Sequence, residues 1–133
     1  MSIPTVDSIL YGGKSAVVSD IAGINAMLAN DEPEVTVVLN DNITSNISIP
    51  AGKKVILDLG GNSARTVNAV GEGSEVVIKN GTVASGSSAN AVTVGNGGKA
   101  TIEDGAVIIG TRNNGIEVTS GGEVVVNGGE ISA

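Results

Sequence analysis

The 133-residue sequence predicts an all-β fold, a parallel β-helix (solenoid) of about four to five coils with a period of ~24 residues. The first observation is a repeat. The stretches SEVVIKNGTV, GKATIEDGAVI and GGEVVVNGGEI place Ile78, Ile102 and Val126 in one column at steps of 24 residues. The second is the composition, with 20 Gly, one Tyr, and no Phe, Trp, Cys or His. Units of this kind favour strands over helices and bury their apolar faces against their neighbours.

The N-terminal segment, residues 1–13, is predicted to be an extended arm. Pro4 and the pair Gly12-Gly13 interrupt it in the manner of a linker. A frayed terminus is the alternative interpretation. If the arm anchors the protein, the residues expected to contact a partner are Ile3, Pro4, Val6, Ile9, Leu10 and Tyr11.

Residues 14–133 are predicted to form one β-helix domain that begins with a short capping helix at about 19–30. Ser19 is the expected N-cap, and Ile21, Ile24 and Leu28 follow at helical spacing. A helix here would cover the first coil, whose end would otherwise expose unpaired backbone groups. The stretches EVTVVLN and NISIP then supply strands of a first, less regular coil.

The regular coils are predicted over about 52–133. In the best-defined unit we expect three strands, at 75–79, about 82–84 and 91–94, which make a triangular coil. The stretch GKKVILDLGG fits the same template at an offset of 21 residues, with Leu57 below Ile78. Further columns are expected at the 24-residue offset: Gly73, Gly97 and Gly121; Gly81, Gly105 and Gly129; Val70, Val94 and Val118; Val83, Val107 and Ile131; and Asn90 with Asn114 at a corner.

Alternation within the strands separates inward from outward side chains. The inward set is Val55, Leu57, Leu59, Val76, Ile78, Ala100, Ile102, Val124 and Val126. The outward set is Ile56, Val77, Thr101 and Val125, which we call the outer stripe. The stripe is a candidate partner-binding surface. The alternative is that β-branched residues simply suit the solvent face of a strand.

The last coil, which runs to GGEISA, shows no helix, polar cap or charged strand that would cover it. Uncovered strand edges pair readily with other chains, so we expect this coil to be covered by another subunit, to be twisted, or to be continued by residues absent from this chain, with oligomerisation or attachment to another protein favoured. Self-association is expected on this ground, with a homotrimer among the forms it could take.

Composition and charge limit the classes of partner. The net charge of −7 repels phosphate backbones and anionic membranes, so neither nucleic acid nor a membrane is expected as a partner. A single aromatic residue leaves carbohydrate binding weakly supported. The N-terminus has neither the basic segment nor the apolar stretch of a secretory signal, so synthesis in the cytoplasm is expected.

Catalytic candidates are few. Without His or Cys, nucleophile–base pairs of the Ser-His and Cys-His types are excluded. The carboxylates in or beside strands are Asp58, Glu75, Glu103, Asp104 and Glu123, and the neighbours Glu103 and Asp104 would face opposite ways. The column Glu75, Lys99 and Glu123 alternates in charge and indicates a surface ladder. No cofactor or metal site is expected, because GNGGKATIED departs from the calcium-binding repeat in the place of its Asp and in its period.

At the level of a single coil, GKKVILDLGG, SEVVIKNGTV and GGEVVVNGGEI resemble the pectate-lyase-like superfamily of single-stranded right-handed parallel β-helices. The predicted helix with EVTVVLNDNITSNISIPAGKKVILDLGG is similar to the way such domains begin in phage tailspikes, so the likeness covers about residues 14–133. The resemblance implies a right-handed coil, as does the rule for parallel crossovers. Enzymes of the superfamily carry acidic clusters with Arg or His in a groove, and none of these residues is matched here.

The expected function is that of a non-enzymatic structural protein of a phage virion, a capsid decoration or head-fibre protein whose arm anchors it to capsid or other virion proteins. A host-binding or cell-surface adhesin module is the alternative. A fragment of a polysaccharide-degrading enzyme is a third, less favoured reading, because one fold serves all three classes.

Overall fold

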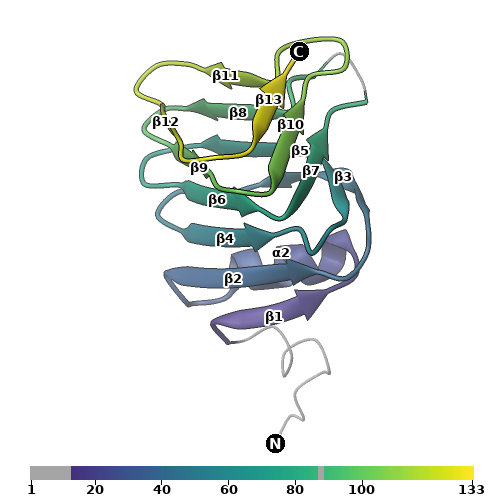
Figure 1. Cartoon of the computed structure of the whole chain (residues 1–133). Coiled ribbons are helices and arrows are strands. Elements are labelled where there is room, and N and C mark those ends of the chain that lie inside the picture. Colours follow the sequence, from purple (N-terminus) through teal and green to yellow (C-terminus); the bar gives the residue numbers. More distant parts are fainter. Residues whose placement is uncertain (1–12, 87–88) are drawn as a thin grey trace, which may run out of the picture.

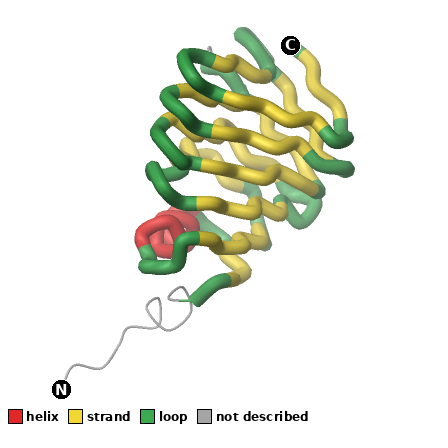
Figure 2. The backbone as a smooth tube through the Cα atoms, turned by 90° about the vertical axis from the view of Figure 1, so that its left-hand side faces the viewer, coloured by secondary structure: helices red, strands yellow, loops and turns green. Residues whose placement is uncertain are grey.

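The computed structural model describes residues 13–86 and 89–133 and confirms a parallel β-solenoid of about five turns, with a period of ~23 residues. The turns stack from the purple N-terminal end to the yellow C-terminal end in Figure 1. All the strand pairings in the described residues are parallel. Figure 2 shows the strands stacked in successive turns, with the helix near the N-terminal end.

One side of the solenoid is a six-stranded sheet, which we call sheet A. Its strands in spatial order are β1 (Ser15–Val18), β2 (Glu34–Leu39), β4 (Lys54–Asp58), β6 (Glu75–Lys79), β9 (Lys99–Ile102) and β12 (Glu123–Val126). The inward and outward residues alternate along each strand, as strand geometry requires. Sheet A therefore presents one continuous outer face along the stack.

The second sheet, sheet B, forms the other two sides. Its strands in order are β11 (Ile116–Val118), β8 (Val92–Gly95), β5 (Ser63–Val70), β7 (Gly81–Ala84), β10 (Ala106–Ile109) and β13 (Glu130–Ser132), and β3 (Ile43–Ser48) pairs with β5. The first residues of β5 pair with β7 and its last four with β8. The single strand β5 therefore spans both sides of its coil that β7 and β8 occupy separately in the next coil. The three-stranded coil predicted at 75–94 is confirmed as β6, β7 and β8.

The predicted register of sheet A is confirmed. Leu57 pairs with Ile78, Ile78 with Ile102, and Ile102 with Val126, so both the 21-residue and the 24-residue offsets hold. From Val55 to Ile102 the predicted inward side chains are 0–1% exposed. The core is built from aliphatic side chains stacked in columns, each one covered by the next coil.

Three predicted columns in sheet B are wrong by one residue. Val83 pairs with Ile108 instead of Val107, because the chain runs four residues from Ile102 to Ala106 but only three between their partners, Ile78 and Gly81. For the same reason Gly81 pairs with Ala106 instead of Gly105. Val94 pairs with Ala69 instead of Val70, which leaves Val70 43% exposed. An alignment at a constant offset of 24 residues does not account for turns that differ in length by one residue from coil to coil.

One corner of the solenoid is a column of glycines. Gly73, Gly97 and Gly121 were predicted to stack, and they do so with φ of +74°, +85° and +73°. The column extends to Gly52, at φ +77°. A Cβ at Gly73 would lie 3.3 Å from Gly52 Cα, and one at Gly121 would lie 3.3 Å from Gly97 N. Both the left-handed backbone and the close stacking therefore favour glycine at this corner.

The N-terminal end is closed by α2 (Ile21–Ala29), which contacts β1, β2 and β3. The helix prediction is confirmed, but the N-cap is Asp20, not Ser19: Asp20 Oδ1 accepts a hydrogen bond of 2.9 Å from Gly23 N. Ile24, Met27 and Leu28 are 1%, 0% and 7% exposed, so the apolar face of α2 lies over the first coil. This arrangement covers the core at that end.

Candidate partner-binding surface

The structure brings the four residues of the outer stripe into one row on sheet A. Ile56 pairs with Val77, Val77 with Thr101, and Thr101 with Val125. Ile56, Val77 and Val125 are half-buried and Thr101 is 8% exposed, because each side chain stacks on its neighbours. The alignment is as expected, whereas partner binding by the stripe stays a prediction.

A row of alternating charge runs beside the outer stripe. Glu34, Lys54, Glu75, Lys99 and Glu123 pair in register across five strands, and we call them the charged row. Lys54 Nζ lies 3.2 Å from Glu34 and 3.8 Å from Glu75, and Lys99 Nζ lies 3.8 Å from Glu123. The hydrogen bond with Glu34, and then the charge of Glu75, raise the pKa of Lys54. The sequence indicated only the last three members, because the earlier coils break the 24-residue spacing.

The other carboxylates are spread over the surface. Asp58 accepts a hydrogen bond of 3.3 Å from Asn80, and Glu103 accepts one of 3.1 Å from Asn127. Asp104 is exposed. Among residues 13–86 and 89–133, no three His, Cys, Asp or Glu residues gather in a way that could hold a metal ion.

Lys53 lies at the N-terminal end, 5% exposed, and fastens the chain that follows α2. Its Nζ donates hydrogen bonds of 2.9 Å to the Asn30 carbonyl and 2.8 Å to Asn30 Oδ1. Burial lowers the pKa of Lys53, while the charges of Asp31 and Glu32 oppose this shift. Because these contacts hold the end of the helix in place, we assign Lys53 a structural role.

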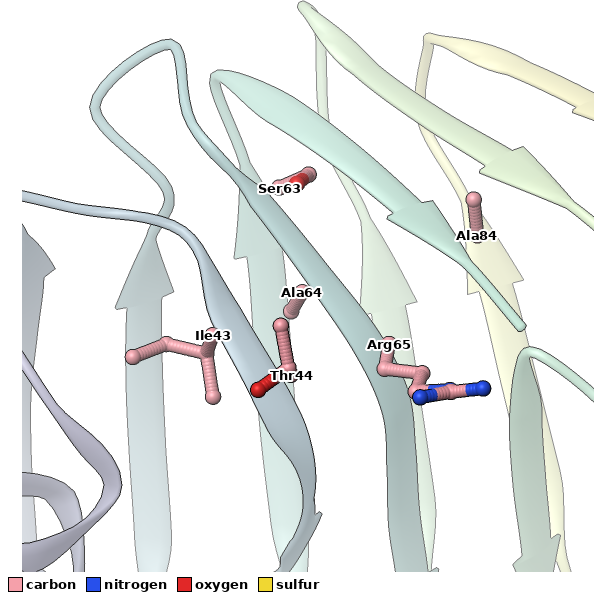
Figure 3. A pocket seen from close by; sticks show the side chains of 6 residues that line it. All are labelled: Ile43, Thr44, Ser63, Ala64, Arg65 and Ala84. Atoms are coloured by element: carbon pink, nitrogen blue, oxygen red, sulfur yellow. The ribbon is translucent and has the colours of Figure 1, made fainter. Parts of the chain in front are cut away.

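A shallow hollow of about 220 Å³ lies on sheet B (Figure 3). It is lined by Ile43, Thr44, Ser63, Ala64, Arg65 and Ala84, from β3, β5 and β7. Arg65 Nε donates a hydrogen bond of 3.3 Å to the Ser85 carbonyl. The Arg65 guanidinium extends toward the Ser85 backbone, away from the hydroxyls of Thr44 and Ser63 (Figure 3). Sequence reasoning missed this hollow, because Arg65 stands alone in a strand and fits no motif.

The C-terminal end of the solenoid is open. Within the described residues β11, β12 and β13 each pair with one strand only, and their upper edges are free (Figure 1). Val118, Val126 and Ile131 are 49%, 54% and 42% exposed. Their partners one coil below, Val94, Ile102 and Ile108, are all 0% exposed. We call these three strands with their inward side chains the open end.

The open end was expected from the sequence, but its exposed residues were not singled out. Val126 was expected to point inward, and its register confirms this. It is exposed because no described coil lies above it. If Ile108 had replaced Val107 in the predicted column, Ile131 would have been aligned with the buried Val83 and Ile108. Together with Val118 and Val126 it forms the inward set of this end.

The predicted arm contacts, Ile3, Pro4, Val6, Ile9, Leu10 and Tyr11, lie outside the described residues. No helix in the described part of the chain has both the length and the hydropathy needed to cross a membrane.

The comparisons with known proteins found no matching family model, no matching curated protein and no matching solved structure. The geometry of the surfaces described above is therefore the basis for a functional assignment.

Proposed function

We propose that this chain is a non-enzymatic structural protein of a virion, a capsid decoration or head-fibre protein that assembles with other proteins. The observation that carries the proposal is the outer face of sheet A, where the outer stripe forms one continuous row beside the charged row. Aliphatic side chains that line up on an outer face mark interaction sites. The N-terminal arm supplies the second attachment point in this proposal.

The dispersed carboxylates support a structural role over a catalytic one. Asp58 and Glu103 lie on the outer face of sheet A, where each accepts a hydrogen bond from an asparagine. Neither belongs to a group of three acidic residues that could hold a metal ion among the described residues. On polyuronic acids we therefore expect no cleavage by the wild-type protein; activity that fell in Asp58→Ala or Glu103→Ala would instead favour the enzyme reading.

The Arg65 hollow favours an adhesin module as the second candidate. The Arg65 guanidinium at its rim is suited to the carboxylate of an acidic sugar. Binding to an array of acidic glycans that is lost in Arg65→Ala, and retained in the matched surface variant Arg112→Ala, would favour this candidate. The weak point of the adhesin reading is the lack of an aromatic side chain in the hollow.

The experiment that tests the proposed function is immunogold electron microscopy with an antibody against the purified protein. The antibody is applied both to particles produced from the genome that encodes the chain and, in parallel, to the cells that produce them. Labelling of particle surfaces is expected, and it should be lost in particles made with a version lacking residues 1–12. Labelling of cell surfaces with none on particles would contradict the virion assignment and favour the adhesin.

A further inference from the structure

The outer face of sheet A carries charges on both sides of the outer stripe. The charged row lies two residues before the stripe on each strand, and another row lies two residues after it. In that row Asp58 pairs with Lys79, and Glu103 follows on the next coil, where its N donates a hydrogen bond of 3.0 Å to the Ile78 carbonyl. We call Asp58, Lys79 and Glu103 the second row, and all three are half-buried.

The two rows have opposite signs on each of three neighbouring coils. The pairs are Lys54 with Asp58 at β4, Glu75 with Lys79 at β6, and Lys99 with Glu103 at β9. Members of a pair are four residues apart, about 13 Å along the strand, so they do not contact each other. Alternation within a row stabilises the pairing of adjacent coils. Two rows that alternated in step would serve that purpose equally well, so contacts within one chain leave the reversal across each strand unexplained.

A two-fold axis parallel to the stack of coils gives this reversal a role. Such an axis sets sheet A of one copy against sheet A of a second copy, with each coil facing the same coil and the two sides of the outer stripe exchanged. The charged row of one copy then faces the second row of the other: Lys54 opposite the partner's Asp58, Glu75 opposite the partner's Lys79, and Lys99 opposite the partner's Glu103. No like charges face one another on these coils, and the outer stripes meet in the centre.

The alternative two-fold axis, along the strands, would lay each row against itself with the order of the coils reversed. Alternation alone then matches opposite charges, whatever the relation between the two rows, so this arrangement leaves the reversal unexplained. The charges that distinguish the two arrangements lie at β4, β6 and β9, and each of these strands pairs with a strand on both sides. The charge pattern therefore belongs to the middle of the solenoid and involves neither end.

We propose that the outer face of sheet A binds a second copy of this chain in a parallel dimer, with the outer stripe at its centre and opposite charges along both borders. This inference rests on the proposed function, since it names the partner of the same face. Both copies place their α2 ends on one side, which suits the attachment of both arms to one particle. The face covers roughly 400 Å² per copy, from about five coils at ~4.8 Å and about five residues at ~3.3 Å, so we expect a weak, reversible dimer.

Sedimentation velocity of the 133-residue chain tests the dimer from about 5 to about 500 μM, the range in which an interface of this size should associate. We expect a monomer at the low end and a dimer at the high end, with association weakened by salt. Glu75→Lys would place like charges opposite the partner's Lys79, and Lys79→Glu would do so opposite the partner's Glu75. Each variant alone should weaken dimerisation by about tenfold or more, since two attractive contacts become repulsive in a symmetric dimer.

Mixing the two variants identifies the arrangement. In the mixed pair every contact between positions 75 and 79 joins opposite charges again, so dimerisation should return to the wild-type level. In the alternative arrangement position 75 faces the partner's Lys54 or the partner's Lys99, and mixing would not restore the dimer. A monomeric wild type, or no recovery on mixing, would overturn the proposal.

The matched controls make the same charge changes away from sheet A. Glu117→Lys lies on β11 of sheet B, and Arg112→Glu lies in the exposed turn before it. Both variants should dimerise as wild type does, because neither position lies on the outer face of sheet A. Loss of the dimer in these variants would show that net charge, and not the two rows, controls association, and would overturn the proposal.

Failure of the dimer and failure of the proposed function are distinguishable. A monomeric chain whose antibody still labels particle surfaces would overturn the dimer and leave the virion role. A dimer that recovers on mixing, in a protein found only on cell surfaces, would support the dimer and overturn the virion role.

Discussion

The two ends of the solenoid bury the same column of side chains to very different extents. Val37, Leu57, Ile78, Ile102 and Val126 pair in one inward column of sheet A. The first four are 0% exposed, and Val126 is 54% exposed. At the N-terminal end β1 continues the column, because its half-buried Ala16 pairs with Val37, and α2 contacts both β1 and β2. At the C-terminal end no described element lies over Val126.

The difference shows that the position of a residue in its coil determines whether the side chain points inward. The coils on either side determine how much its burial contributes to the free energy of unfolding. In a stacked repeat each unit is stabilised by the units on either side of it. An inward aliphatic residue with one neighbour has lost only part of its apolar surface to the core. The covered part of the column therefore behaves as a core, whereas the inward side chains of the open end keep much of their surface in solvent.

The largest effect is expected from a charge placed in the covered part of this column. Ile102→Asp would bury an unpaired carboxylate among aliphatic side chains and should destabilise the protein by more than about 4 kcal/mol, enough to unfold it. Far-ultraviolet circular dichroism and urea titration measure this.

The matched control is Val126→Asp, one coil above in the same column. Because this side chain is already 54% exposed, the change in the free energy of unfolding should stay within about 1 kcal/mol. Equal destabilisation by both substitutions would show that the open end is covered in the isolated protein.

A smaller effect is expected at the helical cap. Met27→Ala removes a side chain that is 0% exposed and should cost about 2–5 kcal/mol. Ile131→Ala at the open end should cost under about 1 kcal/mol, because that side chain is 42% exposed. Urea titration of both variants compares the ends directly, and a larger loss at Ile131 would reverse the comparison.

The next effect concerns the first turn of α2. Asp20→Ala removes the acceptor for Gly23 N and should lower the free energy of unfolding by about 1 kcal/mol. Ser19→Ala, one residue earlier, is the control and should have little effect. A larger loss at Ser19 would restore the N-cap that the sequence suggested.

The smallest effect is a pH dependence at the closed end. Burial holds the pKa of Lys53 below 10.5 in the folded protein, so between the folded pKa and 10.5 the unfolded chain binds more protons. The contribution of Lys53 to the free energy of unfolding should therefore rise with pH across this window. Comparing wild type with Lys53→Met by urea titration measures it, and a difference that fell with pH would contradict the shift.

Sequence reasoning identified the solenoid because its signals are local and repeated. Glycine at a corner, Asn-Gly in a turn, and alternation within EVVI recur at nearly constant spacing, and parallel stacking turns that spacing into contacts. The outer stripe and the inward column of sheet A were predicted correctly for this reason, since sheet A keeps constant offsets across the regular coils.

The errors lie where the chain compensates an insertion in one turn with a deletion in another. Ile108, not Val107, faces Val83 because the preceding turn is longer by one residue. Asp20, not Ser19, caps α2, and both residue types suit the position equally. The exposure of Val126 and the Arg65 hollow depend on contacts between distant segments, which no local pattern encodes.

The measurement that tests the central claim most directly is deuterium exchange of the 133-residue chain free in solution. Amides of β12 and β13 should exchange far faster than those of β4 and β6, because no described coil covers the open end. Equal protection of these four strands would contradict the comparison between the two ends.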